Sequence, residues 1–200
     1  TSVYYIPKNP TLDTYKAIIQ ENDYWEALRN TALLSVGCGV IQMFCCALVG
    51  YGFAKFNFRG KKLLFIAVIL TMIVPHETIQ LSLFTQFRYF DVWGIAGSIK
   101  SLILSMQGQA VAAKQETVNL LDSYWPLAIL SMTCLAFKNG LFIFVYRQFY
   151  RGVPDELEEA AYVDGASVMK TYMKIIVPMS IPIFVTIFMF AFSWQWTDMF

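Results

Sequence analysis

Four long stretches of this chain carry almost no charge, and this feature restricts the possible folds more than any other. They are residues 30–54, 63–82, 125–146 and 175–197. Each is close to the ~20 apolar residues that a helix needs to cross a bilayer. A segment in lipid must satisfy its own backbone hydrogen bonds, and none of the four alternates like a barrel strand. With 57% hydrophobic and 14% charged residues, the sequence predicts an all-α, polytopic transmembrane helical bundle.

The connection between the first two stretches indicates how the chain is oriented. Four basic residues and no acid occupy it: Lys55, Arg59, Lys61 and Lys62. Short loops that are rich in Lys and Arg stay in the cytoplasm. Alternation then predicts that residues 1–29 and 83–124 lie outside and that residues 147–174 lie inside. We therefore expect an extracytoplasmic segment over 1–29 and a transmembrane domain over 30–200.

The second predicted cytoplasmic loop contains a spaced motif. Three residues separate Glu159-Ala160-Ala161 from Gly165, and nine more separate Gly165 from Ile175-x-Val177-Pro178. Acidic residues after Pro154 suit the first turns of a helix. Gly165 suits a helix end, and Ser167 suits the N-cap of a second helix. The spacing predicts a helix–turn–helix hairpin on the membrane surface that continues rigidly into the span at 175–197.

The residues of this segment resemble those of a known family. The motif is similar to the cytoplasmic signature loop of the membrane subunits of bacterial ABC importers, with Val177 in place of leucine. Residues 137–198 look like the carbohydrate-type permeases, which include the maltose and glycerol-phosphate systems. The matching residues are Arg147-Gln148-Phe149, Val153 to Ala161, Asp164-Gly165-Ala166, Pro178, Pro182 and Trp196-Thr197-Asp198, with further matches at Asn9-Pro10-Thr11-Leu12 and Ala54-Lys55-Phe56. Residues 97–124 do not fit and are interpreted as an insertion on the outer side.

The resemblance implies a subunit of a larger assembly. Such permeases carry about six spans of ~20 residues each, so we expect the four spans here to belong to a fragment of a longer chain. The implied partners are a second permease subunit, a cytoplasmic ABC ATPase dimer, an extracytoplasmic solute-binding protein and the lipid of a bacterial cytoplasmic (inner) membrane. The implied function is ATP-driven import of a sugar or sugar-like solute. ATP and Mg would be used by the ATPase, so this chain is expected to bind no cofactor.

The resemblance also implies roles within the hairpin, which would act as the coupling helix in a cleft of the ATPase. Glu159 would face a basic residue of the ATPase, Ala160 and Ala161 would permit close packing, and Gly165 would supply the turn. The full set expected to serve ATPase coupling is Glu158, Glu159, Ala160, Ala161, Asp164, Gly165 and Pro178.

Polar residues inside the predicted spans are candidates for the solute path, because a charge at bilayer depth usually faces a cavity or a partner. Lys138-Asn139-Gly140 interrupts the third span, and Gln80 lies in the second. Lys138 could equally snorkel, with Gly140 as a helix-packing site. Pro75-His76-Glu77 marks either a hinge or the end of the second span. Further candidates, which the sequence does not rank, are Gln42, Gln86 and Gln195.

Several function classes lack support. A net charge of +1 predicts no nucleic-acid partner. The four cysteines and the single histidine form no metal-ligand spacing, so we expect no metal site. A phosphate-binding GxxxxGK[ST] loop and an acid–base set are both missing from the sequence, which argues against an enzyme. Two alternatives stay open: an ABC permease for an amino acid, peptide or anion, and an ATPase-independent carrier or channel.

Overall fold

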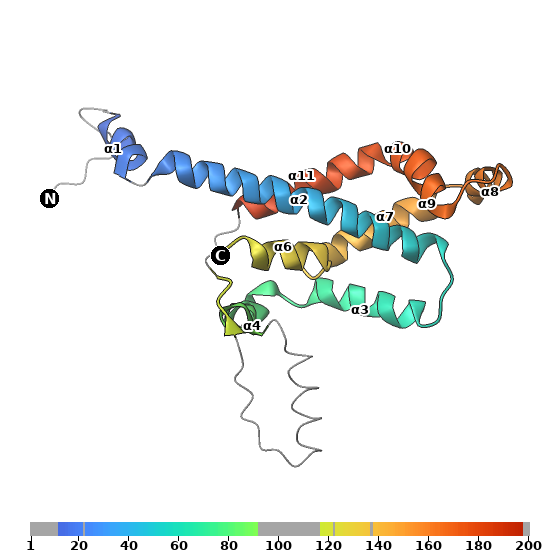
Figure 1. The fold of residues 1–200 in the computed structure, drawn as a ribbon, viewed down its shortest axis with the longest axis horizontal. Helices are drawn as coiled ribbons and strands as arrows, with labels where there is room; N and C mark the ends of the chain where they lie inside the picture. The colour runs from blue at the N-terminus through green and yellow to red at the C-terminus, as the bar shows by residue number, and fades with distance from the viewer. Residues whose placement is uncertain (1–11, 22, 92–116, 122, 137, 198–200) are drawn as a thin grey trace, which may run out of the picture.

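The computed structural model describes residues 12–21, 23–91, 117–121, 123–136 and 138–197. Within these ranges the chain is almost entirely helical, as predicted, with one pair of two-residue strands (Figure 1). In order, the elements are α1 (Asp13–Glu21), α2 (Tyr24–Lys55), α3 (Lys61–Ile73), α4 (His76–Arg88), β1 (Phe90–Asp91), β2 (Thr117–Val118), α6 (Trp125–Met132), α7 (Asn139–Arg151), α8 (Asp155–Val163), α9 (Val168–Thr171), the π-helical turn η1 (Tyr172–Ile176), α10 (Val177–Met179) and α11 (Ile181–Thr197). Strand β2 pairs antiparallel with β1. Most of the predicted insertion at 97–124 lies outside the described residues.

Helix α2 is the central element against which the others pack. Its 32 residues correspond to ~48 Å of helix, more than the ~30 Å core of a bilayer. Helices α7 and α11 lie along α2 (Figure 1). At Gly50 the backbones of α2 and α7 are so close that an added Cβ atom would lie 2.6 Å from the Cβ of Tyr146. Small residues permit this kind of contact between membrane helices.

The second predicted span, 63–82, is not one straight helix. Helix α3 ends at Ile73, and the segment Thr78–Arg88 departs from its direction by 104°. The cause is Pro75, which has no N–H to donate and disfavours helical geometry in the residue before it. Both alternatives for this motif, a hinge and a span end, required a break here. The side chains of His76 and Glu77 lie outside the described part of the structure.

The prediction of a single helix for the third span, 125–146, is also wrong. It is divided into α6 and α7, and Cys134 between them has a left-handed backbone with φ 57°. The N–H groups of Leu135 and Ala136 both donate to the carbonyl of Leu130, which closes α6. A positive φ is uncommon for a residue other than glycine. No Pro or Gly lies at this position, so hydropathy alone does not indicate a break before the interruption expected at Lys138-Asn139-Gly140.

The fourth predicted span, 175–197, is likewise not one straight helix that continues from the hairpin. The segment Val168–Met179 and helix α11 meet at an angle of 77°. Ser180 lies at the bend, and its hydroxyl donates to the carbonyl of Ile176 at 2.5 Å. Pro182 follows and cannot donate a helical hydrogen bond. By length and composition, α2 alone can cross a bilayer among the described helices, and up to three spans result if each bent pair counts as one.

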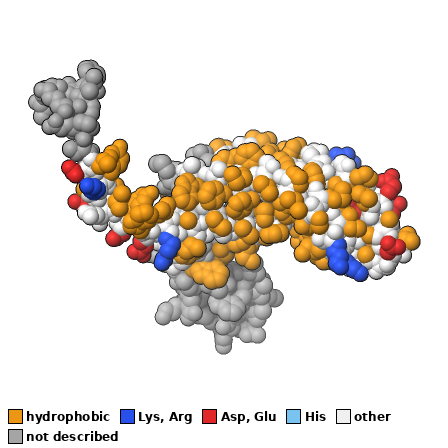
Figure 2. Space-filling model, turned by 90° about the horizontal axis from the view of Figure 1, so that it is seen from above, with side chains coloured by type: hydrophobic (Ala, Val, Ile, Leu, Met, Phe, Trp, Pro, Cys, Tyr) orange, Lys and Arg blue, Asp and Glu red, His pale blue; other side chains and the backbone are white. Residues whose placement is uncertain are grey.

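Apolar side chains cover much of the outer surface. Figure 2 shows a hydrophobic band along the middle of the molecule, with charged side chains gathered toward its ends. Large apolar side chains that are exposed include Leu63, Ile66 and Leu70 of α3 and Val185 and Met189 of α11. Surfaces of this kind are expected to be covered by lipid or by another protein. The basic α2–α3 loop and α8 lie at the same end, and α1 lies at the opposite end (Figure 1).

Candidate functional site

The motif forms the predicted hairpin. Helix α8 ends at Val163, and Gly165 just beyond it has a φ of +77°, a region that glycine enters without a steric penalty. The N–H of Ala166 donates to the carbonyl of Ala161 at 2.9 Å, and the N–H of Gly165 donates to that of Tyr162 at 3.0 Å. These two bonds make a Schellman motif, a common helix ending. The turn is therefore defined by local hydrogen bonds.

The second arm of the hairpin begins as the sequence predicts. Ser167 is the N-cap of α9, and its hydroxyl accepts a bond from the N–H of Lys170 at 3.4 Å. The chain then continues through η1 and α10. Pro178, in α10, is exposed.

The residues of the motif divide between the surface and the interior. Glu159, Ala160 and Asp164 are exposed, whereas Ala161 and Glu158 are buried. Among the described residues Glu159 has no ion-pair partner. Large apolar side chains are also exposed around the hairpin, chiefly Leu157, Tyr162, Val163, Val168 and Met169. An acidic, small and apolar surface is thus presented at the charged end of the molecule.

Glu158 faces the end of α2. Its Oε2 accepts a hydrogen bond from the hydroxyl of Tyr51 at 2.8 Å, and its Oε1 lies 3.2 Å from Nζ of Lys55. Lys55 also donates to the carbonyl of Val153 at 2.7 Å and to Asp155 at 2.5 Å. The side chains of Lys55 and Glu158 are each only 8% exposed. The sequence grouped Glu158 with the ATPase-facing residues, and only the tertiary structure places it against α2.

A group of tyrosines surrounds this polar contact. The ring of Tyr51 lies 4.7 Å from that of Tyr172 and 5.6 Å from that of Tyr150, measured between centroids. Tyr150 is fully buried. Burial raises the pKa of Tyr150, so its hydroxyl stays protonated at all physiological pH values. Tyr51 therefore touches α7, α8 and η1 from a single position on α2.

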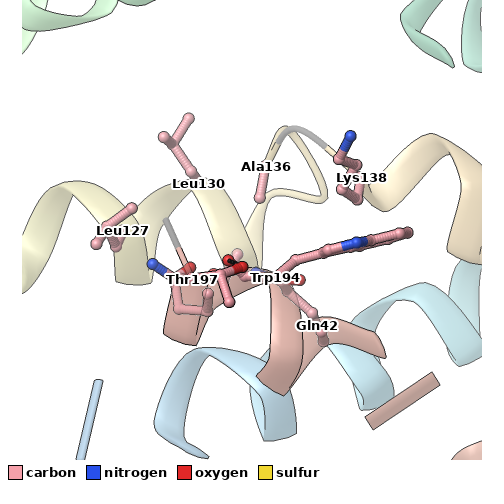
Figure 3. Close-up of a pocket in the computed structure, with 10 residues that line it drawn as sticks. Gln42, Leu127, Leu130, Ala136, Lys138, Trp194 and Thr197 are labelled. Atoms are coloured by element: carbon pink, nitrogen blue, oxygen red, sulfur yellow. Dashed lines mark hydrogen bonds between the residues drawn. The ribbon is translucent and has the colours of Figure 1, made fainter. Parts of the chain in front are cut away.

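A cavity of about 210 Å³ lies between α2, α6, α11 and the start of α7. Its polar and aromatic lining consists of Gln42, Ser131, Lys138, Trp194, Gln195 and Thr197 (Figure 3). Nε2 of Gln42 donates to the hydroxyl of Ser131 at 3.1 Å. Nζ of Lys138 lies 5.1 Å from the centroid of the Trp194 ring, within the range of a cation–π contact.

The predicted solute-path residues do not all reach this cavity. Lys138 lines it, whereas Asn139 is fully buried and its side-chain atoms have no hydrogen-bond partner in the described structure. Gly140 packs against α3, where an added Cβ would contact Thr71 and lie 3.0 Å from the carbonyl of Val68. This contact fits the helix-packing alternative for Gly140. Gln80 lines a separate, mostly apolar hollow between α4 and α6.

Among the polar and aromatic lining residues, sequence reasoning missed three: Ser131, Trp194 and Thr197. Each is an ordinary residue for a membrane helix, and no local signal distinguishes it. Gln42 and Gln195 were among the unranked candidates. Only the packing of α2, α6 and α11 brings these side chains together.

Comparison with protein families identifies the class of the molecule. Residues 47–200 match the binding-protein-dependent transport system inner membrane components. The chain belongs to this family. The matched region includes the hairpin and every residue that lines the cavity except Gln42. Membership confirms the predicted class, a helical inner membrane component of a binding-protein-dependent transport system.

Several curated relatives of this permease component align along nearly all of its length. The osmoprotective compounds uptake permease protein GgtD of Synechocystis is 28% identical over 94% of this chain and 53% of its own length. The trehalose transport system permease protein SugB of Mycobacterium tuberculosis is 28% identical over 97% and 60%, respectively. The alpha-glucoside transport system permease protein AglG of Rhizobium meliloti is 26% identical over 96% and 44%. The chain spans about half the length of these relatives.

Proposed function

We propose that this chain is a permease subunit of an ATP-driven ABC importer that takes up a sugar or sugar-like solute delivered by an external binding protein. The family description and the names of the trehalose and alpha-glucoside relatives support this class of cargo. The observation that carries the proposal is the hairpin, which presents Glu159 and Ala160 at the charged end of a membrane-type bundle. A second permease subunit and a cytoplasmic ATPase dimer complete the assembly.

The ATPase docks on the hairpin in this proposal. Coupling requires a compact element that moves as one body between two states. The Schellman turn at Gly165 and the cap at Ser167 hold the hairpin in one shape. Glu159 supplies an unpaired anion, Ala160 permits a close backbone approach, and exposed Val163 adds apolar area. A groove that combines a basic residue with apolar walls would complement this surface. ATP and Mg are used by the ATPase, not by this chain.

The chain is assigned to the bacterial cytoplasmic membrane, with several passes through the bilayer. The basic α2–α3 loop and the hairpin share one end of the bundle, as a common cytoplasmic location requires. The end with α1 faces outward, where the binding protein delivers its cargo.

The cavity between α2, α6 and α11 is proposed as the part of the solute path that this subunit contributes. Solute sites combine a mostly apolar lining with a few converging polar groups. The Trp194 ring offers a flat face for the C–H surface of a sugar ring, and Gln42, Ser131 and Lys138 offer partners for hydroxyl groups. Asn139, Gly140 and Gln80, which do not line it, play supporting or separate roles.

Cross-linking in native membranes tests the proposal. The four native cysteines are replaced in the full-length protein, and Tyr162→Cys is introduced on the exposed hairpin surface. A photoactivatable reagent on this cysteine captures its neighbour, which mass spectrometry identifies. Tyr24→Cys, an exposed tyrosine at the opposite end of α2, is the matched control.

We expect Tyr162→Cys to capture an ABC-type ATPase, Glu159→Lys to weaken this capture, and Tyr24→Cys to capture none. A hairpin cysteine that is labelled from the cytoplasm yet captures no ATPase would sink the coupling assignment and favour the ATPase-independent carrier. Capture of an ATPase together with a binding protein that carries an amino acid or peptide would retain the importer but replace the sugar.

A further inference from the structure

The end of α2 is bound to three parts of the coupling region at once. Lys55 reaches the carbonyl of Val153, just before the hairpin, and Asp155 in the first turn of α8. Tyr51, one helical turn earlier, holds Glu158 by a hydrogen bond of 2.8 Å and packs against Tyr172 on the returning arm. Both arms of the hairpin are therefore attached to one turn of α2.

The attachment is buried and specific. Lys55 and Glu158 have side chains that are 8% exposed, so neither charge is satisfied mainly by water. Two charges removed from water require good geometry and additional hydrogen bonds. Tyr51 and the Val153 carbonyl supply those bonds. This arrangement resists small displacements better than an exposed ion pair, in which the side chains exchange partners with solvent.

The turn of α2 that carries these residues belongs to the packed core. Gly50 brings α2 against Tyr146 of α7, and Tyr51 lies in ring contact with Tyr150 of the same helix. Movement of this turn therefore moves α2 and α7 together. By contrast, the covalent route from the hairpin to α11 includes the π-helical turn η1 and the 77° bend at Ser180, so it is a poor straight lever.

We propose that Tyr51, Lys55 and Glu158 form a clamp that fixes the hairpin to α2, so that displacement of the hairpin by the ATPase moves α2 and α7 as one body. The three are positioning residues. The clamp rests on the proposed function, because it requires an ATPase that moves the hairpin. In this proposal the motion of the hairpin reaches the bundle through a noncovalent contact with α2, in addition to the covalent connection to α11.

Distance measurements in the assembled complex test the clamp. Spin labels are placed at Glu156→Cys on α8 and Leu48→Cys on α2, both exposed positions. The full transporter in nanodiscs is compared without nucleotide and after trapping with MgATP and vanadate. We expect one narrow distance distribution that is the same in both states. Lys55→Met should broaden it or shift it on trapping, and Lys55→Arg should preserve it.

Further variants separate the clamp from general loss of folding. Lys55→Met with Glu158→Gln removes both buried charges, which avoids an unpaired ion but still abolishes the contact. Lys62→Met changes an exposed lysine outside this contact and should leave the Glu156–Leu48 distance unchanged. We also measure how much the binding protein stimulates ATP hydrolysis. This stimulation should be about fivefold or more lower in the double variant than in the wild type, because fivefold is the lower end of typical coupling between sites.

The outcomes distinguish the clamp from the function on which it rests. Absence of vanadate trapping in the purified complex would contradict the proposed ATPase partnership. Trapping that proceeds while the wild-type Glu156–Leu48 distance changes would overturn the clamp alone. An unaltered distance and full stimulation in the double variant would overturn it too.

Discussion

The two halves of this bundle differ in how they treat polar groups. At the hairpin end, Lys55, Tyr51 and Glu158 are buried and paired with one another among packed tyrosine rings. Toward the other end, Gln42 and Lys138 line a cavity, and helices α3 and α6 end just before Pro75 and Cys134. Paired polar groups in a dense core transmit displacement, whereas polar groups around a hollow can exchange partners with a solute. In the function proposed above, the subunit thus separates force transmission from solute contact along its length.

The largest expected effect is at the paired end. Lys55→Met leaves the buried carboxylate of Glu158 without its cation, which should lower the free energy of unfolding by about 3–5 kcal/mol. Thermal unfolding of the detergent-purified subunit measures this loss. Lys62→Met, at an exposed lysine of the next helix, is the control and should change stability by no more than about 0.5 kcal/mol. Equal melting temperatures for the two variants would contradict the claim that Lys55 and Glu158 form a buried pair.

Helix contact near the same end gives the next effect. Gly50→Val places side-chain atoms where Tyr146 already lies, and overpacking of this kind costs about 1–3 kcal/mol. Gly52→Val is a matched control two residues away, since a Cβ there has nothing within 4 Å. Thermal unfolding of both variants should rank Gly50→Val as the less stable. The reverse order would mean that α2 and α7 are not closely packed at this point.

At the cavity end the expected effect is on transport. Trp194→Leu removes the aromatic face, and such a contact contributes about 0.5–1.5 kcal/mol beyond its area. The KM for uptake by the reconstituted importer should therefore rise about threefold to tenfold. Trp125→Leu changes an exposed tryptophan outside the cavity and should leave the KM unchanged. Equal KM values for both variants would exclude Trp194 from solute contact.

The smallest effect on the subunit itself is expected at the exposed carboxylate. Glu159→Gln should change the stability of the subunit by no more than about 0.5 kcal/mol, because the side chain is exposed. The affinity of this variant for the ATPase should nevertheless fall about tenfold or more, because Glu159 is proposed to pair with a buried basic residue of the ATPase. Surface plasmon resonance with the purified ATPase measures this affinity. A variant that melts early but binds normally would reverse the proposed roles of Glu158 and Glu159.

Local features of the structure were predictable because neighbouring residues decide them. Gly165 ends α8 through its own backbone conformation, and Ser167 caps α9 through a residue three positions away. The apolar stretch at 30–54 likewise appears within the single long helix α2. The interruption at Pro75 was readable from the covalent geometry of proline. In each case the determining atoms lie within a few residues of one another.

The breaks at Cys134 and Ser180 were not predictable in this way. Hydropathy treats a stretch of apolar residues as continuous, and it does not report which carbonyl accepts a bond from Leu135 or from the Ser180 hydroxyl. The predicted third and fourth spans were consequently too regular.

The sequence by itself determined a helical membrane component, its family and the shape of the hairpin, because composition and short-range spacing carry that information. Tertiary structure alone decided that Glu158 turns inward while Glu159 stays outside, and that Gln42, Ser131 and Trp194 share one cavity. Tyr51 and Glu158 are 107 residues apart in the chain, and Gln42 and Ser131 are 89 apart. Contacts over such separations depend on how whole helices pack against one another, which no local pattern specifies.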